Sequence, residues 1–263
     1  MNWQKIDMTK LISIAEEAGQ IIMGYYNNSF DVMKKDDDSP VTAADFAASK
    51  YIVDKLAEFF PDIPALSEES EEVVFKQRRQ WKNFFLIDPL DGTKEFIKRS
   101  HEFTVNIAYI SDCVPYLGVI HIPAEGVTYY GSHEGSFIKD SKGTRPLPVK
   151  EFEEGKLNVM ISKSHLNEET KAYIEDLKSR YEVEYFNVGS SIKICKVAEG
   201  SADLNPRLGV GTKEWDIAAG HAIVIGAGGD IHILGTTTRV PYNKESLHNP
   251  EYEVKRKELL KKF

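Results

Sequence analysis

The sequence predicts a mixed α/β protein, with an α+β lobe over residues 1–150 and an α/β lobe over residues 151–263. Three observations predict this order: two helical patterns open the chain, closely spaced strand patterns follow from residue 84, and strands alternate with helices after residue 150. The 263 residues are 41% hydrophobic, which is enough to build a sizeable core and excludes a disordered chain.

The first sixty residues predict two amphipathic helices. Apolar side chains recur at three- and four-residue spacing from Leu11, and Asp7 could cap this helix. Residues 27–40 are rich in turn formers and predict a connection or a short hairpin. The second helix should begin near Val41 and end before Pro61, because proline cannot continue a helix. Its expected apolar face contains Phe46, Ser49, Val53, Leu56 and Phe60.

The rest of the chain predicts strands first and then alternating elements. The strands with period two, expected to pair antiparallel, are residues 84–88, 103–110, 115–122, 126–132 and 135–140. After an expected loop over 141–156, strands at 157–162, 181–186, 202–205 and 230–234 alternate with helices at 167–180, 190–200 and 215–227. Residues 226–230 predict a helix end and a turn, and the basic tail 255–263 predicts a solvated segment.

Composition and motifs exclude several classes of protein. A net charge of −8 argues against binding to a nucleic-acid polymer. No apolar stretch reaches 18 residues, and the N-terminus lacks the apolar core of a signal peptide, so we expect a cytoplasmic protein without a transmembrane segment. Cys113 and Cys195 form neither a disulfide framework nor a metal-type pair, and Cys195 should lie in the core. HExxH and GxSxG motifs are absent.

The most informative segment is Asp88-Pro89-Leu90-Asp91-Gly92-Thr93, directly after a predicted strand. Because Pro89 fixes φ and lacks an N–H, we expect the chain to turn there and to aim both carboxylates and the Leu90 carbonyl at one point. Such an all-oxygen cluster suits Mg²⁺. Gly92 would let a ligand approach the backbone, and the short helix after it would favour phosphate at its start.

Two further acidic segments carry less weight when each is taken alone. Glu68 lies in Leu-Ser-Glu-Glu-Ser at 66–70, which by itself indicates a solvated acidic turn. Asp216 opens the apolar helix at 215–227, where an ordinary N-cap is the simpler interpretation.

Taken together and in order, residues 39–45, 66–70, 88–93 and 215–220 resemble the Mg²⁺-dependent, lithium-sensitive phosphomonoesterases of the inositol monophosphatase superfamily. The resemblance covers nearly the whole chain and implies a layered α-β-α-β-α fold. It implies one cation at Glu68, Asp88 and the Leu90 carbonyl, and a second at Asp88, Asp91 and Asp216. Two such cations can clamp the attacking and leaving oxygens of an in-line phosphoryl displacement by water. The resemblance also implies that Thr93, paired with Asp45, activates the water.

A finer resemblance concerns the substrate. The run at 88–97, with residues 162–165, 189–203 and 205–209, is similar to the 3′(2′),5′-bisphosphate nucleotidases. In these segments Lys193 and Arg207 could hold a second phosphate, since arginine suits bidentate contacts. The substrate-binding residues implied are Glu68, Leu90, Asp91, Gly92, Thr93, Ser162, His165, Gly189, Ser190, Lys193, Arg207 and Asp216.

The expected activity is removal of the 3′-phosphate of adenosine 3′,5′-bisphosphate, which gives AMP and phosphate. The resemblance also implies a place in sulfate assimilation and action on the sulfated precursor. An inositol or other sugar phosphatase is the alternative enzyme, and a non-catalytic nucleotide-binding sensor is the alternative from another class. Inositol phosphatases carry a glutamate shortly before the tryptophan–aspartate pair, where Gly209 falls here, but Glu214 leaves that comparison open. The preferred ester, the resting metal count and the oligomeric state stay open.

Overall fold

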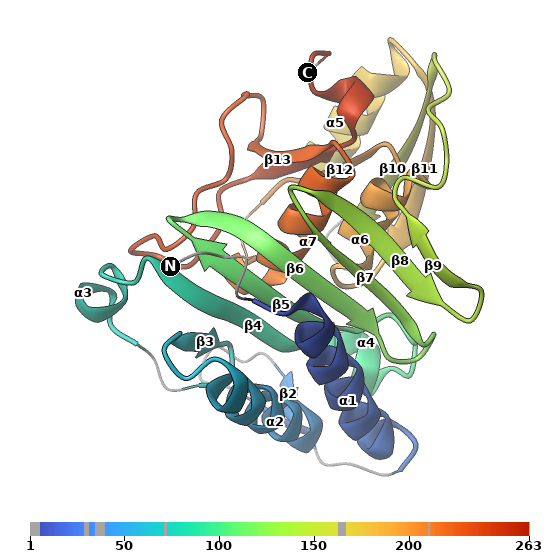
Figure 1. Ribbon diagram of the computed structural model, residues 1–263. Coiled ribbons are helices and arrows are strands. Elements are labelled where there is room, and N and C mark those ends of the chain that lie inside the picture. Colours follow the sequence, from blue (N-terminus) through green and yellow to red (C-terminus); the bar gives the residue numbers. More distant parts are fainter. Residues whose placement is uncertain are drawn as a thin grey trace.

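The computed structural model describes residues 6–28, 32–34, 40–70, 73–162, 167–209 and 211–262. Helices α1 (Met8–Tyr26) and α2 (Ala43–Phe59) cover one face of a seven-stranded sheet. Helices α6 (Ile192–Glu199) and α7 (Glu214–Gly226) lie between that sheet and a five-stranded sheet, and α5 (Glu168–Lys178) lies outside the second sheet (Figure 1). This is the layered α-β-α-β-α arrangement that the resemblance implied.

The larger sheet has the strand order β3-β4-β5-β6-β7-β8-β9. Its strands are β3 (Ala65–Ser67), β4 (Asn83–Asp91), β5 (Thr104–Ser111), β6 (Val114–Ile122), β7 (Val127–Ser132), β8 (Gly135–Asp140) and β9 (Gly143–Pro146). The antiparallel pairing expected from β4 to β8 is confirmed. Two strands were not expected: β3 pairs parallel with β4, and β9 lies in the segment predicted as a loop.

The smaller sheet has the order β11-β10-β12-β14-β13. Its strands are β10 (Lys156–Ser162), β11 (Glu182–Val188), β12 (Leu204–Arg207), β13 (Asp230–Ile233) and β14 (Tyr252–Lys255). The expectation of a fully solvated basic tail is wrong for its first residues. Lys255 is completely buried and pairs with Glu253 at 3.0 Å, and Arg256 pairs with Asp203 at 2.8 Å. These two carboxylates, one local and one distant in sequence, make the burial of the two cations possible.

The N-terminal helices form largely as predicted. Asp7 caps α1, and the hairpin of β1 (Val32–Lys34) and β2 (Pro40–Thr42) leads into α2. The predicted apolar face of α2 is wrong in part, because Phe46 is 45% exposed. The buried stripe runs instead through Ala44, Ala48, Ile52 and Leu56, since alanines allow a close approach to α1. Short helices α3 (Phe75–Arg78) and α4 (Thr93–Ile97) and a 3₁₀ turn (Lys257–Leu259) complete the described elements.

Helix α7 links the two sheets. It packs against the face of the larger sheet, where a Cβ added to Gly118 of β6 would lie 2.1 Å from the Ala219 carbonyl oxygen. The helix ends at Gly226, as residues 226–230 predicted, and Gly228 has a φ of +90°. Helix α7 packs on β13 of the smaller sheet as well as on the larger sheet, so it contacts both predicted lobes. The division of the chain into two lobes near residue 150 stays a prediction.

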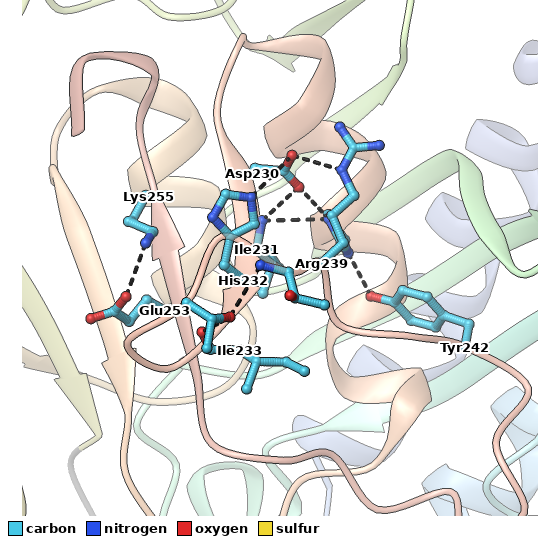
Figure 2. A network of polar contacts seen from close by, with 11 residues as sticks. Asp230, Ile231, His232, Ile233, Arg239, Tyr242, Glu253 and Lys255 are labelled. Carbon is cyan, nitrogen blue, oxygen red and sulfur yellow. Dashed lines mark hydrogen bonds and ion pairs between the residues drawn. The ribbon is translucent and has the colours of Figure 1, made fainter. Parts of the chain in front are cut away.

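A buried polar network fixes α7 to the smaller sheet (Figure 2). His221 of α7 lies 2.9 Å from the Tyr242 hydroxyl through Nδ1 and 2.8 Å from Asp230 Oδ1 through Nε2. Arg239 Nε donates to the other oxygen of Asp230 at 2.7 Å, and these neighbours hold the pKa of Asp230 at about 2 against the effect of burial. The rotation of α7, and hence of the residues at its start, is therefore fixed.

Among the described residues, no helix has both the length and the apolar character needed to cross a bilayer.

Candidate active site

The Asp-Pro-Leu-Asp segment continues strand β4 through a bulge, so the predicted turn at Pro89 is wrong. Asp88 faces Asn106 and Asp91 faces Thr104 on β5, with a register shift between the two pairs. Three steps along β4 therefore match two along β5, and Pro89, which lacks an N–H, is tolerated within such an irregularity. The inserted residue lets Asp88 and Asp91 lie on one face of the sheet. The chain leaves the strand at Gly92, whose φ is +95°.

Three carboxylates from separate elements meet beside this bulge. Oxygens of Glu68, Asp88 and Asp216 all lie within 4.8 Å of one another. Glu68 follows β3, and its N–H donates to the Ile87 carbonyl at 3.0 Å. Asp216 lies in the first turn of α7, where its Oδ2 accepts the N–H of Lys213 at 2.8 Å. Asp91, the fourth predicted acidic ligand, is not part of this triad and instead lines the adjacent cavity.

The electrostatics of these carboxylates favour a bound cation. Burial first, and then neighbouring Glu68, Asp91 and Asp216, raise the pKa of Asp88 well above its ordinary value. Burial also raises the pKa of Asp216 well above its ordinary value and that of Asp91 to about 6. Buried carboxylates that raise one another's pKa are normally paired or coordinate a metal. An oxygen-only donor set of this kind fits a hard divalent cation.

Asp45 and Thr93 meet beside the acidic cluster. Asp45 is 1% exposed, and its Oδ2 accepts hydrogen bonds from both the N–H and the hydroxyl of Thr42, at 2.8 and 2.6 Å. Its Oδ1 accepts the Thr93 hydroxyl at 3.1 Å, and that hydroxyl is also 3.3 Å from the Leu90 carbonyl oxygen. A hydroxyl that donates its one hydrogen to a carboxylate keeps two lone pairs to accept a hydrogen from water.

A cavity of about 190 Å³ opens next to Asp91 and Asp216. Of the predicted site residues it is lined by Asp91, Gly92, Ser162, Gly189, Ser190, Lys193, Arg207 and Asp216. His165 lies outside the described residues. The sequence interpretation missed further lining residues, among them Lys94, Glu95, Ser191, Asn205, Thr212 and Tyr252. Lys94, Glu95, Ser191 and Asn205 lie within the segments recognised in the sequence and could have been found there, whereas Thr212 and Tyr252 lie outside them.

Two cations, the half-buried Lys193 and the buried Arg207, lie in the wall of this cavity. Arg207 is 8% exposed, its Nε has no hydrogen-bond partner, and none of the described carboxylates forms an ion pair with it. Lys193 donates to the carbonyls of Ser190 at 2.6 Å and Val188 at 3.2 Å, and burial lowers its pKa although Asp91 acts in the opposite direction. Since burying a charge without a partner is costly, a guanidinium in this position indicates that the cavity accepts an anion.

Neither candidate for the inositol-type glutamate lines this cavity. Glu214 is fully buried, and its carboxylate accepts the N–H groups of Asn243 and Lys244 at 2.7 and 2.9 Å and the Lys244 ammonium at 2.7 Å. Gly209 donates its N–H to Glu251 at 2.7 Å. Glu214 therefore stabilises the loop that follows β13, and its carboxylate points away from the site.

Comparisons with known proteins agree with this geometry. The family model described as the inositol monophosphatase family matches residues 4–263. The 3′(2′),5′-bisphosphate nucleotidase CysQ of Salmonella typhimurium is 42% identical over 250 residues, which cover 94% of this chain and 98% of that protein. The corresponding protein of Haemophilus influenzae is 34% identical over 252 residues, which cover 93% and 91%.

Solved structures give the same result. The crystal structure of CysQ from Bacteroides thetaiotaomicron, described as a bacterial member of the inositol monophosphatase family, has 39% identity and a TM-score of 0.86, with coverage of 95% and 96%. An IMPase of Thermotoga maritima, at 24% identity and a TM-score of 0.74 with coverage of 96% and 92%, shares the fold. The carboxylate triad, the layered fold and the full-length matches lead to one conclusion: this chain belongs to the inositol monophosphatase family.

Proposed function

We propose that this chain is an enzyme, a Mg²⁺-dependent 3′(2′),5′-bisphosphate nucleotidase that converts adenosine 3′,5′-bisphosphate to AMP and phosphate. The observation that carries the proposal is the charge pattern of one cavity: carboxylates that suit cations at one end, and two cations in its wall, the half-buried Lys193 and the buried Arg207. A substrate with two phosphates matches such a pattern, and the relatives at 34–42% identity bear this activity in their names. The resemblance further supports lithium sensitivity, a cytoplasmic location and a role in sulfate assimilation.

In this proposal the carboxylates hold two cations. Glu68, Asp88 and the Leu90 carbonyl would hold the first, and Asp88, Asp91 and Asp216 the second. When bound, the cations would neutralise charge on the phosphoryl oxygens and make a water molecule more acidic. The scissile 3′-phosphate would lie at the acidic end, and Lys193 and Arg207 would hold the 5′-phosphate that is not cleaved.

The chain's own residues would place the attacking water and its proton. Thr93 would accept a hydrogen bond from the water while its hydroxyl donates to Asp45, which supplies negative charge without touching the substrate. Ser162 and Ser190 could contact the ribose, because both line the cavity. The water oxygen would bond to phosphorus as the bond from phosphorus to the ribose 3′-oxygen breaks, and a proton lost by the water would pass to that 3′-oxygen. AMP would then keep its 5′-phosphate at Arg207.

Arg207→Ala tests the assignment of the second phosphate. The two substrates should differ only in the group that Arg207 would hold, so kcat/KM is measured on adenosine 3′,5′-bisphosphate and on adenosine 3′-monophosphate. A lost charge-assisted hydrogen bond is worth roughly 1.5–3 kcal/mol, or about ten- to a hundred-fold in kcat/KM. We expect this loss on the bisphosphate and a change of less than about twofold on the monophosphate.

The exposed Arg180, which pairs with Asp176 at 2.7 Å, offers a matched control. Arg180→Ala removes the same charge outside the cavity and should leave both rates unchanged. Equal losses on the two substrates in Arg207→Ala would make Arg207 structural. A parent enzyme that prefers inositol 1-phosphate would establish the sugar-phosphatase alternative, and a parent that releases no phosphate from any ester would establish the sensor.

A further inference from the structure

Three small polar side chains are buried together beneath the acidic cluster. Thr104 and Asn106 of β5 and Ser191 at the start of α6 are 0%, 1% and 3% exposed. Ser191 Oγ donates to Asn106 Oδ1 at 2.9 Å and lies 2.8 Å from Thr104 Oγ1. Because the Ser191 hydroxyl has one hydrogen, already given to Asn106, the Thr104 hydroxyl must be the donor to Ser191. The three groups form one directed chain.

Ser191 is the member on which the other two depend. Within the part of the chain that the structure describes, the Asn106 side chain bonds Ser191 alone, and its Nδ2 has no partner. Thr104 and Asn106 also face Asp91 and Asp88, respectively, across the β4–β5 pair. The chain of hydroxyl and amide groups therefore lies directly beside the two aspartates of the bulge.

The main chain of Ser191 contacts Asp91 itself. Its N–H donates to Asp91 Oδ2 at 2.5 Å, across an interval of 100 residues in sequence. The residue before it, Ser190, has a φ of +48°, and this strained backbone is held because the Ser190 carbonyl accepts the Lys193 ammonium at 2.6 Å. The residue before Ser190, Gly189, is held by Glu102, whose carboxylate accepts the Gly189 N–H at 2.9 Å. The segment 189–191 thus joins the cation in the cavity wall to the carboxylate at the cluster.

We propose that Ser191 is a positioning residue, which sets the orientation of the Asp91 carboxylate for a divalent cation and links occupation of the cavity at Lys193 to cation binding. The link rests on the proposed function, because it takes the cavity as an anion site and Asp91 as a ligand. An anion that contacts the Lys193 ammonium competes with the Ser190 carbonyl for that ammonium. A resulting shift of Ser190 would move the N–H of Ser191, which Asp91 accepts. By reciprocity, a cation at Asp91 must change anion affinity by the same factor.

The experiment measures cation binding without turnover. Mn²⁺ binding is followed by the paramagnetic resonance of the free ion, with and without AMP as the anion in the cavity. Partners that orient metal ligands are worth about 10–100-fold in metal affinity. In Ser191→Ala we expect Mn²⁺ affinity to fall about tenfold and the mutual effect of AMP and Mn²⁺ to shrink towards none.

Two variants and one control make the result specific. Ser191→Thr keeps the hydroxyl and should retain most of the Mn²⁺ affinity, whereas Thr104→Val removes the donor to Ser191 and should weaken it. Ser136, 2% exposed and bonded to the Ile223 carbonyl at 2.7 Å, is a buried serine away from the site, and Ser136→Ala should bind Mn²⁺ as the parent does.

Parental Mn²⁺ affinity in folded Ser191→Ala overturns the inference, and if that variant does not fold, parental affinity in Thr104→Val does so. The proposed function can fail separately. A parent that binds Mn²⁺ in a Ser191-dependent way but releases no phosphate from the bisphosphate keeps this inference and loses that function.

Discussion

At the scale of single residues, Asp45 has two roles that the sequence alone did not separate. One carboxylate oxygen closes a capping box with the N–H and hydroxyl of Thr42, which begins α2. The other accepts the Thr93 hydroxyl beside the acidic cluster. Replacing Asp45 therefore changes both the helix and the proposed water site, while replacing Thr93 changes only the second. Thr93 is the cleaner probe of water activation.

Thr93→Ala should lower kcat without lowering stability. The carboxylates supply most of the charge that attracts cations, so Mg²⁺ affinity should stay within about tenfold, whereas positioning of a general base contributes roughly 10²–10⁴-fold to the rate. Asp45→Asn should lose activity as well and should also lose about 1 kcal/mol of stability with the cap. Rates and melting temperatures of the two variants are compared. Parental turnover in both would contradict the pairing of Asp45 with Thr93.

At the scale of elements, the sequence predicts what local patterns determine. Helix α1 follows from the spacing of its apolar residues, and strands β5 to β8 follow from short strand-like runs separated by turn residues. The bulge at Pro89 cannot be predicted from the sequence pattern of β4, because a register shift depends on the partner strand. Strand β14 was missed because it lies between β12 and β13, and a strand with both neighbours distant in sequence is set by tertiary pairing. In the same way, Tyr252 reaches the cavity through tertiary packing alone.

Substituting two glycines by alanine should change the stability of the protein in opposite directions: Gly118 lies where β6 contacts α7, and Gly24 lies in α1. A Cβ on Gly118 would lie 2.1 Å from the Ala219 carbonyl oxygen, so Gly118→Ala must push α7 away and should cost about 1–3 kcal/mol. Gly24, in the last turns of α1, has no atom within 4 Å of such a Cβ, so Gly24→Ala should stabilise by about 0.5–1 kcal/mol.

Denaturant unfolding of both glycine variants checks these signs. Because α7 carries Asp216, folded Gly118→Ala should also bind Mg²⁺ more weakly than the parent, whereas Gly24→Ala should bind it equally. A Gly118→Ala variant as stable as the parent would mean that α7 does not rest on β6 as closely as the structure has it.

At the scale of the whole molecule, the acidic cluster opposes the stability of the fold that holds it. Asp88 is 2% exposed, and burial together with four neighbouring carboxylates raises its pKa well above the ordinary value. Elsewhere the chain pairs its buried carboxylates, as Asp203 with Arg256 at 2.8 Å. At Asp88 burial and the repulsion of neighbouring carboxylates dominate, which is the state expected where function requires a cation.

Asp88→Asn should therefore stabilise the protein in a chelator while it abolishes activity. At pH 7.5 we expect a gain of about 1 kcal/mol or more, which is roughly 2–4 °C in melting temperature. A carboxyl with a raised folded pKa binds its proton in the folded state first, so the parent gains stability as the pH falls through that value. The difference in stability between Asp88→Asn and the parent should therefore become smaller as the pH falls. Mg²⁺ should stabilise the parent and not the variant.

Asp203→Asn, which leaves Arg256 buried without its carboxylate, should destabilise the protein under the same conditions. Equal destabilisation by the two substitutions, with or without Mg²⁺, would mean that Asp88 holds the fold together rather than a cation.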